Sequence, residues 1–442
     1  MKVAWGLVLG MGCADAEPVA RVPAAPAAPP NAPDVLLVSL DTARADMVDA
    51  QTMPTLTALA ADGTRHAWAF THAPTTASSH ASVFTGLDPH GHGVVRNGHR
   101  LRADVPTLAE RFSAAGWDTA GIVAASVLDR ATGLDRGFAE WTLDLPLDRG
   151  RRHEATADHV TDLAVARLAR QDATRPLLLF VHYYDAHGPY DAPAPWTRRF
   201  GAQGYTGPVD GSPAGTTALA NALRTGTARP ADVEELRARY RGELGFIDSQ
   251  LARLLEARRA RPTLVAVFGD HGEALGDSAI PGYGGELLQP IGHGADVDLV
   301  ASHVPLVYAG PGIPARIDER PVALSSVGST LLAHAGIEGA LGGPPATAIP
   351  TEATQPLEAS GGTGWPNARM ERGVVLGETL VIEAPWRGRP PAGYRRDAMQ
   401  TPAPVPTEAL AALRAWDAAA PGDASRAQDA QAEALRALGY AE

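Results

Sequence analysis

The sequence predicts an α/β fold in which a mostly parallel central sheet is flanked by helices, followed by a small C-terminal α+β subdomain. Short continuous apolar runs are typical of parallel strands buried on both faces, and they occupy residues 34–40, 176–184, 263–268 and 303–312. Residues 231–261 carry apolar side chains on one helical face, as expected of a helix packed on a sheet. Polar residues follow several strands directly, where open α/β sheets place ligand sites.

Composition limits the classes of partner. The chain has 442 residues, 45% of them hydrophobic, which is enough to bury a large core. Its formal net charge of −12 argues against nucleic acid as a partner. Lys2 is the only lysine, so any basic group in an anion site must be Arg or His.

The N-terminus has the pattern of a bacterial export signal. Residues 1–13 combine Lys2, a short apolar stretch and a Gly12-Cys13 pair that resembles a lipoprotein cleavage site. Residues 14–33 are rich in Ala and Pro and indicate an extended tether. We therefore expect an exported protein of the periplasm or cell envelope, anchored to the membrane by a lipid on Cys13. This is the only cysteine, so no intrachain disulfide forms.

The first strand, residues 34–40, ends at Asp41, and the strand at 263–268 ends at Gly269-Asp270-His271. Carboxylate and imidazole groups on rigid elements suit a hard or borderline divalent cation. Taken alone, Asp41 also fits a turn or a helix N-cap.

Hydroxyl side chains crowd the start of the next segment, residues 75–86, and apolar residues fill its end. Ser78 and Ser79 are good N-cap residues, so the segment predicts a short helix whose free N–H groups face an anion such as phosphate or sulfate. An ordinary capped helix is the alternative for this segment alone. Downstream, Asn97 fits either a turn or a hydrogen bond to a substrate oxyanion.

The C-terminal end of the strand at 176–184 carries His182, Asp185 and His187, and a later Gly-rich loop carries His293. A single histidine at a strand end is commonly structural. Two histidines and an aspartate within six residues instead indicate a functional edge of the sheet. For His293 a structural role in the loop stays open.

These separated motifs, in this order over most of residues 34–312, resemble the sulfatase and alkaline phosphatase superfamily, in the branch with Thr or Ser in place of the modified Cys. The resemblance implies one divalent metal (Ca, Mg, Mn or Zn) held by Asp41, Asp270, His271 and the oxygen of Thr76, which is also the nucleophile. His80 stands where the family usually has Arg.

The resemblance also gives His182, His187, His293 and His80 catalytic roles near the anion or the leaving group. A second metal bound by Asp185 and His187 stays open. Glu273 is expected either behind the metal ligands or at a helix cap. Ser78 stands at the family's usual Pro position, and the family's anion-binding Lys is missing.

The expected function is metal-dependent hydrolysis of an anionic phosphate or sulfate ester through Thr76. Threonine cannot be oxidised to the aldehyde that classical sulfatases use, which favours phosphoesters. The alternatives are a sulfuric ester hydrolase without formylglycine, a transferase of phosphoglycerol or phosphoethanolamine groups in the envelope, and a binding protein on a degraded catalytic scaffold. The oligomeric state is not predicted.

The domain boundaries follow from composition. Residues 34–337 form the catalytic domain, 338–365 a Gly/Pro/Thr/Ala linker, and 366–442 the C-terminal subdomain. Within that subdomain we expect a hairpin at 373–382 and two Ala-rich helices in 406–442. Residues 201–230, rich in Gly, Thr and Ala, are expected to form a surface excursion or lid.

Overall fold

The computed structural model describes residues 27–29, 31–146, 154–277, 290–343, 347–354, 370–384 and 389–419. The predicted export signal with Cys13, most of the tether, much of the linker and the second C-terminal helix lie outside the described residues.

A large sheet forms the centre of the molecule and confirms the predicted fold class. It has nine strands in the order β10-β2-β9-β6-β1-β5-β3-β4, with β11 paired to β2. β1 lies in the middle and pairs in parallel with β5 and β6, and β3 and β4 continue the parallel half. β9 runs antiparallel to both β2 and β6. The strands are β1 Asp34–Leu40, β2 Thr64–Phe70, β3 Asp118–Val123, β4 Glu140–Leu143, β5 Leu177–Tyr183, β6 Thr263–Gly269, β9 His303–Ala309, β10 Arg316–Asp318 and β11 Val322–Ala323.

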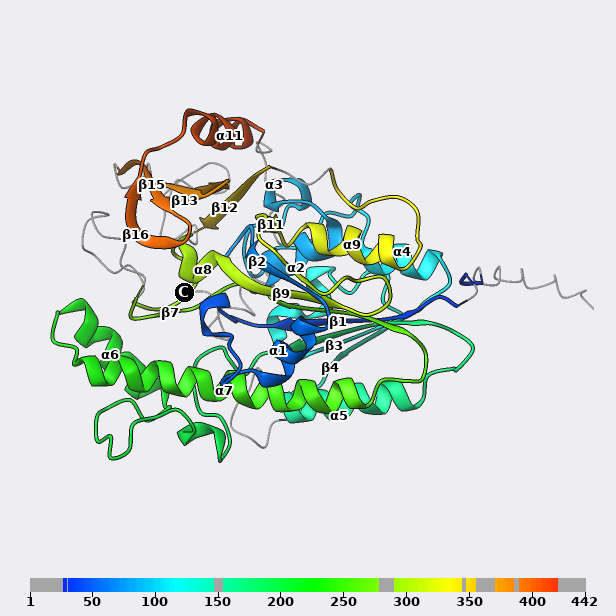
Figure 1. The fold of residues 1–442 in the computed structure, drawn as a ribbon, viewed down its shortest axis with the longest axis horizontal. Coiled ribbons are helices and arrows are strands. Elements are labelled where there is room, and N and C mark those ends of the chain that lie inside the picture. The colour runs from blue at the N-terminus through cyan, green and yellow to red at the C-terminus, as the bar shows by residue number, and fades with distance from the viewer. Residues whose placement is uncertain are drawn as a thin grey trace, which may run out of the picture.

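Helices cover both faces of this sheet (Figure 1). One layer contains α1 Pro54–Ala61, α5 Ala157–Ala169 and α7 Pro230–Glu256, and the other contains α2 Thr76–Thr85, α4 Leu108–Ala114 and α9 Ser326–His334. The predicted amphipathic helix is α7, whose Leu244, Ile247 and Leu251 are fully buried. Every residue of β1 and β5 is buried, as expected for strands covered on both faces.

A second, antiparallel sheet of five strands packs at one end (Figure 1). Its strands are β12 Ala348–Thr354, β13 Met370–Leu376, β14 Thr379–Ala384, β15 Arg389–Arg395 and β16 Ala398–Ala403, and α11 Thr407–Ala418 covers it. The predicted hairpin is β13 and β14. Phe70 of β2 and Val297 join the apolar core of this sheet, which includes Ile349 and Leu380.

The surface excursion at 201–230 contains a regular element that the sequence did not predict, the helix α6 Pro213–Arg224. Ser212 caps it by accepting a hydrogen bond from the Gly215 N–H, 3.1 Å away. The remaining short elements are the helices α3 Pro89–His92 and α8 Leu299–Ser302, the strands β7 Ala274–Leu275 and β8 Ile291–Gly292, and the 3-10 turns Ala45–Met47, Ser126–Leu128, Arg130–Thr132 and Trp196–Arg198. Among the described residues, no helix combines the length and the apolar character needed to cross a membrane.

Candidate active site

The site lies at one edge of the large sheet because three neighbouring strands end there together. In the sheet register Ser39 pairs with His182 of β5, and Leu40 pairs with Gly269 of β6. The residues that follow β1 and β6 therefore emerge side by side, and Asp41 and Asp270 are both completely buried. This edge is where the sequence predicted a ligand site.

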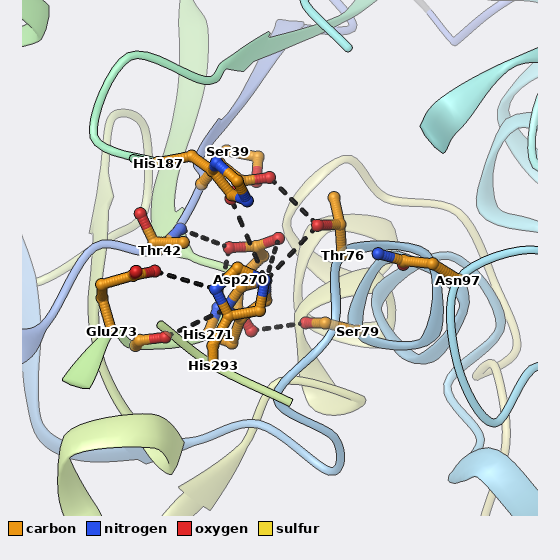
Figure 2. A network of polar contacts seen from close by, with 12 residues as sticks. Ser39, Thr42, Thr76, Ser79, Asn97, His187, Asp270, His271, Glu273 and His293 are labelled. Carbon is orange, nitrogen blue, oxygen red and sulfur yellow. Dashed lines mark hydrogen bonds and ion pairs between the residues drawn. The ribbon is translucent and has the colours of Figure 1, made fainter. Parts of the chain in front are cut away.

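Thr76 reaches the same point from the start of α2 (Figure 2). Its Oγ1 lies 3.2 Å from Asp41 Oδ2 and 3.4 Å from His271 Nε2. The predicted N-cap is wrong in detail. Thr75 occupies the N-cap position without a capping hydrogen bond from its side chain, and Ser78 and Ser79 lie inside the first turn. Their hydroxyls instead donate to the carbonyls of Val94 and Asp270, at 2.6 Å in each case.

Asp41, Asp270 and His271 form a ligand set for a cation. Their ligand atoms lie within 4.8 Å of one another. His271 Nε2 is 3.5 Å from Asp270 Oδ2 and 3.9 Å from Asp41 Oδ1, and both of these carboxylate oxygens are buried without a hydrogen-bond partner. Orphaned buried oxygens are costly unless a cation meets them. The donor set fits a divalent metal of the hard or borderline kind.

The hydrogen bonds around this set leave the right atoms for a metal. Asp270 Oδ1 accepts from the main-chain N–H groups of Thr42, at 3.0 Å, and His271, at 2.7 Å, so Oδ2 is left for the cation. His271 Nδ1 lies 3.1 Å from the Gly272 carbonyl. Nδ1 therefore carries the ring proton, and the Nε2 lone pair is free to bind.

Burial sets the charges of these ligands in the absence of a cation. Desolvation raises the pKa of Asp41 to about 8. It also raises the pKa of Asp270 well above its ordinary value, and the nearby Asp41 carboxyl adds to this shift. Burial lowers the pKa of His271, which keeps the imidazole neutral. The two carboxyls cannot both ionise at neutral pH without a counter-charge.

His80 lies behind the nucleophile and not in front of it. Its Nδ1 donates to the Thr76 carbonyl at 2.7 Å, and its Nε2 lies 2.8 Å from the Ser39 hydroxyl. The ring is completely buried and contacts Phe84 and Phe180. Burial, with a contribution from His182, holds the pKa of His80 well below its ordinary value. His80 therefore brings no positive charge to the place of the family's Arg.

His182 supports a metal ligand. Its Nε2 lies 3.1 Å from Asp41 Oδ2, so one Asp41 oxygen is held by His182 and Thr76 while the other stays available. Burial lowers the pKa of His182 to about 3, so this ring is neutral. In the part of the chain that the structure describes, His80, His182 and Asp270 form a second group of close ligand atoms. Within the described residues, Asp185 and His187 belong to no such group, and Asp185 Oδ1 instead accepts from the Ala157 N–H at 3.1 Å.

His187 and His293 are half-buried and lie beside the metal ligands (Figure 2). The centre of the His293 ring is 4.4 Å from that of His271 and 5.0 Å from that of His187. His293 Nδ1 lies 2.8 Å from Glu273 Oε2. Burial acts to lower the pKa of His293, but the Glu273 carboxylate, together with the Asp41 and Asp270 carboxyls, more than offsets this, and the net shift is upward. For His187 burial dominates and lowers the pKa to about 4.

A family model described as Sulfatase matches residues 33–337. The chain belongs to the sulfatase family. This membership, in the alkaline phosphatase superfamily, makes it an ester hydrolase of the kind that its motifs predicted. Sulfatase-family enzymes use a metal ion, and the buried carboxylates and imidazole described above fit one.

Solved structures share the sulfatase fold over nearly the whole chain. The phosphonate monoester hydrolase of Agrobacterium radiobacter is 22% identical, with a TM-score of 0.63 over 92% of this chain and 96% of that one. The phosphonate monoester hydrolase of Silicibacter pomeroyi is 21% identical, with a TM-score of 0.61 over 87% and 94%. A 2-O GAG sulfatase is 16% identical, with a TM-score of 0.61 over 87% and 90%. No curated protein matched the chain.

Sequence reasoning missed two partners in the site, Ser39 and Tyr190. Ser39 is the one hydroxyl inside the apolar run of β1, and it bonds His80. Tyr190 donates from its hydroxyl to Glu273 Oε1 at 2.8 Å. Of the two roles expected for Glu273, the helix cap is wrong, because its carboxylate bonds His293 and Tyr190. A polar residue in an apolar strand was the available signal for Ser39.

Proposed function

We propose that this sulfatase-family protein hydrolyses a phosphate ester through Thr76 as nucleophile, and that diesters are its preferred class. The observation that carries the proposal is the position of Thr76 Oγ1, within 3.4 Å of both Asp41 Oδ2 and His271 Nε2 at the start of a helix. A nucleophilic hydroxyl needs a nearby acceptor for its proton and a positive environment for its oxygen.

A divalent cation bound by Asp41, Asp270, His271 and the Thr76 oxygen would lower the hydroxyl pKa and offset charge on the reacting anion. The chain supplies the remaining functions. Asp41 Oδ2 accepts the hydrogen bond from Thr76 and is held in place by His182. The start of α2 directs its partial positive charge toward the anion.

Asn97 joins this anion-binding face. Its side-chain oxygen accepts from the Ala77 N–H at 2.8 Å, which fixes the side chain next to the first turn of α2. The amide nitrogen is then the group that Asn97 has left for a substrate oxygen. We infer that Asn97 donates to the anion, in addition to the turn role that its sequence context suggested.

Charge balance favours a substrate with one negative charge. Two carboxylates balance a divalent cation, and His80, His182 and His271 are all neutral because burial lowers the pKa of each. Lys is absent from this region, and the place of the family's Arg is taken by neutral His80. A dianionic phosphate monoester would therefore leave two charges uncompensated in a buried site, whereas a diester would leave only one.

Sulfate esters are the competing class, because they also carry one charge. The family model and the 2-O GAG sulfatase among the similar folds support them. The chemistry of threonine supports phosphate, because Thr76 cannot form an aldehyde hydrate to expel bound sulfate. A phosphothreonine can instead be released by water attacking the phosphorus atom, or by an acceptor alcohol in a transferase.

The test uses the full chain with three 4-nitrophenyl esters: a phosphate monoester, a phosphodiester and a sulfate ester. Each is assayed across divalent metals for the wild type, Thr76→Ala and Thr85→Ala. Thr85 is the matched control, because its buried hydroxyl donates to the Ala81 carbonyl at the far end of the same helix. We expect metal-dependent diester turnover that Thr76→Ala lowers by about 10³-fold or more and Thr85→Ala leaves near the wild-type value.

Sulfate turnover that depends on Thr76 would replace the phosphoester proposal by a sulfuric ester hydrolase without formylglycine. Transfer of the phosphoryl group to an added alcohol in place of water would identify the transferase. Metal binding without turnover of any ester would identify a binding protein on a degraded scaffold.

We further propose that the protein is exported and anchored to the cell envelope by a lipid on Cys13. The support is the sequence pattern of residues 1–33. Globomycin treatment, or Cys13→Ala, should change the membrane-bound fraction of the protein if this cysteine carries the lipid. Equal fractions for wild type and variant would contradict the anchor.

A further inference from the structure

We propose that Glu273, supported by the Tyr190 hydroxyl, is a positioning residue that holds His293 so that its Nε2 serves the leaving oxygen of the ester. The inference rests on the proposed ester hydrolysis and extends it to a residue pair to which no motif gave a role in the reaction. Tyr190, Glu273 and His293 form a chain of hydrogen bonds that ends beside the metal ligand His271.

The Glu273 carboxylate is fixed at both oxygens. Oε1 accepts from the Tyr190 hydroxyl at 2.8 Å, and Oε2 lies 2.8 Å from His293 Nδ1. The main-chain carbonyl of Glu273 accepts from Arg44 Nη1 at 3.1 Å. Glu273 and Tyr190 are only 3% and 1% exposed. A buried carboxylate with every oxygen occupied has little freedom to turn, so it can orient its imidazole partner.

The backbone at His293 does not fix the ring by itself. Gly292 and Gly294 flank it with φ values of 113° and 88°. Glycine adopts such angles readily and leaves the chain with wide conformational freedom. The bond from Nδ1 to Glu273 is therefore the contact that selects the ring orientation, and it leaves Nε2 as the ring nitrogen for the substrate.

The position of His293 suits the leaving group. The His271 side chain is fully buried among the ligand atoms, whereas the His293 side chain is 15% exposed and lies against both His271 and His187. His293 thus stands between the buried anion site and solvent, which is where the organic part of an ester must lie.

The proton transfers balance. In the first step the Thr76 oxygen bonds phosphorus and its proton passes to Asp41. The bond from phosphorus to the leaving oxygen breaks, and that oxygen takes the proton from His293 Nε2. In the second step water gives a proton back to His293 Nε2 as its oxygen bonds phosphorus. The Thr76 oxygen departs and recovers its proton from Asp41. The Nδ1 proton stays in the hydrogen bond to Glu273 throughout.

The kinetic test compares Glu273→Gln and Tyr190→Phe on diesters that differ only in leaving group, 4-nitrophenol against an aliphatic alcohol. General-acid help matters most for a poor leaving group. We expect Glu273→Gln to lower kcat/KM by about 10²-fold for the alkyl ester and less than about fivefold for the nitrophenyl ester. Tyr190→Phe should also lower kcat/KM more for the alkyl ester than for the nitrophenyl ester, but by a smaller factor.

Tyr183→Phe is the matched control. Tyr183 ends β5, and its buried hydroxyl bonds Thr161 of α5 at 2.8 Å and, among the described residues, no group of the site. This variant should leave the ratio of kcat/KM between the alkyl and the nitrophenyl ester unchanged. The proposal would be overturned if Glu273→Gln lowered kcat/KM equally for both esters. It would also be overturned if Glu273→Gln lowered kcat/KM by its full factor in a protein that already carries His293→Asn.

A second readout does not require turnover. In ¹⁵N-histidine spectra of the full chain, the wild type should show the His293 Nδ1 protonated, and Glu273→Gln should shift that ring toward the other tautomer. An unprotonated Nδ1 in the wild type would overturn the positioning role even if the enzyme is active. Absence of all Thr76-dependent turnover would instead refute the proposed function, while the spectra still decide the Glu273–His293 contact.

Discussion

Replacing Asp41 by Asn should remove a pH-dependent loss of stability from the metal-free protein. Burial raises the pKa of Asp41 from 3.8 to about 8. Between pH 5 and pH 7 the folded chain therefore holds a proton that the unfolded chain has released, and stability must fall as the pH rises. The slope is a little more than about 1 kcal/mol per pH unit, so the loss over these two units is about 3 kcal/mol.

Thermal unfolding in the presence of a chelator, at pH 5, 6 and 7, measures this loss. Buried histidines such as His182, whose pKa burial lowers to about 3, act in the opposite direction and gain stability as the pH rises. Because both proteins contain these histidines, subtracting the stability of the wild type from that of Asp41→Asn at each pH cancels the histidine contribution. Asp41→Asn should gain about 3 kcal/mol of stability relative to wild type from pH 5 to pH 7.

Added divalent cation should stabilise the wild type more at pH 7 than at pH 5, because the metal replaces the proton that Asp41 must release. The same addition should stabilise Asp41→Asn less. If the pH curves of the two metal-free proteins run parallel, Asp41 is ionised in the folded chain and the reasoning from its burial is refuted.

Two further predictions follow from other contacts. His80→Arg should lower the free energy of unfolding by about 3 kcal/mol, because it places a fixed charge behind Thr76, where the His80 ring is fully buried against Phe84 and Phe180. A variant as stable as the wild type in urea would contradict this buried position. Trp416→Ala should cost about 2 kcal/mol in urea unfolding, because Trp416 stacks on His90 with ring centres 3.8 Å apart and donates to Asp88 at 2.7 Å. An unchanged unfolding curve would show that α11 does not help to hold the C-terminal sheet.

The central half of the fold was predictable because its strands have a strong and simple signal. β1, β5 and β6 are continuous apolar runs that end in polar residues, and burial on both faces requires such a pattern. The C-terminal sheet has a weaker signal. β15 contains two prolines and β16 one, and proline normally argues against a strand. The sequence therefore predicted only the hairpin of β13 and β14.

The residues of the candidate site also differ in how well the sequence predicts them. Asp41, Asp270 and His271 could be found from sequence because each follows a strand directly, and the sheet brings strand ends together. The bond between His80 and Ser39 could not, because it depends on how α2 lies across β1. The same holds for Tyr190 and Glu273, which are 83 residues apart in the sequence. Sequence patterns locate groups on elements, whereas the partners of those groups follow from packing.

The arrangement also separates two demands on an esterase. The candidate metal ligands and Thr76 sit on strand ends and a helix start, where the buried core holds them in place. His293, which we propose faces the organic part of the ester, sits in a loop between glycines and bonds the Glu273 carboxylate. Changes in that loop can alter the preferred leaving group without moving the metal ligands. Specificity should thus vary through His293 and its neighbours, while Asp41, Asp270 and His271 preserve the chemistry.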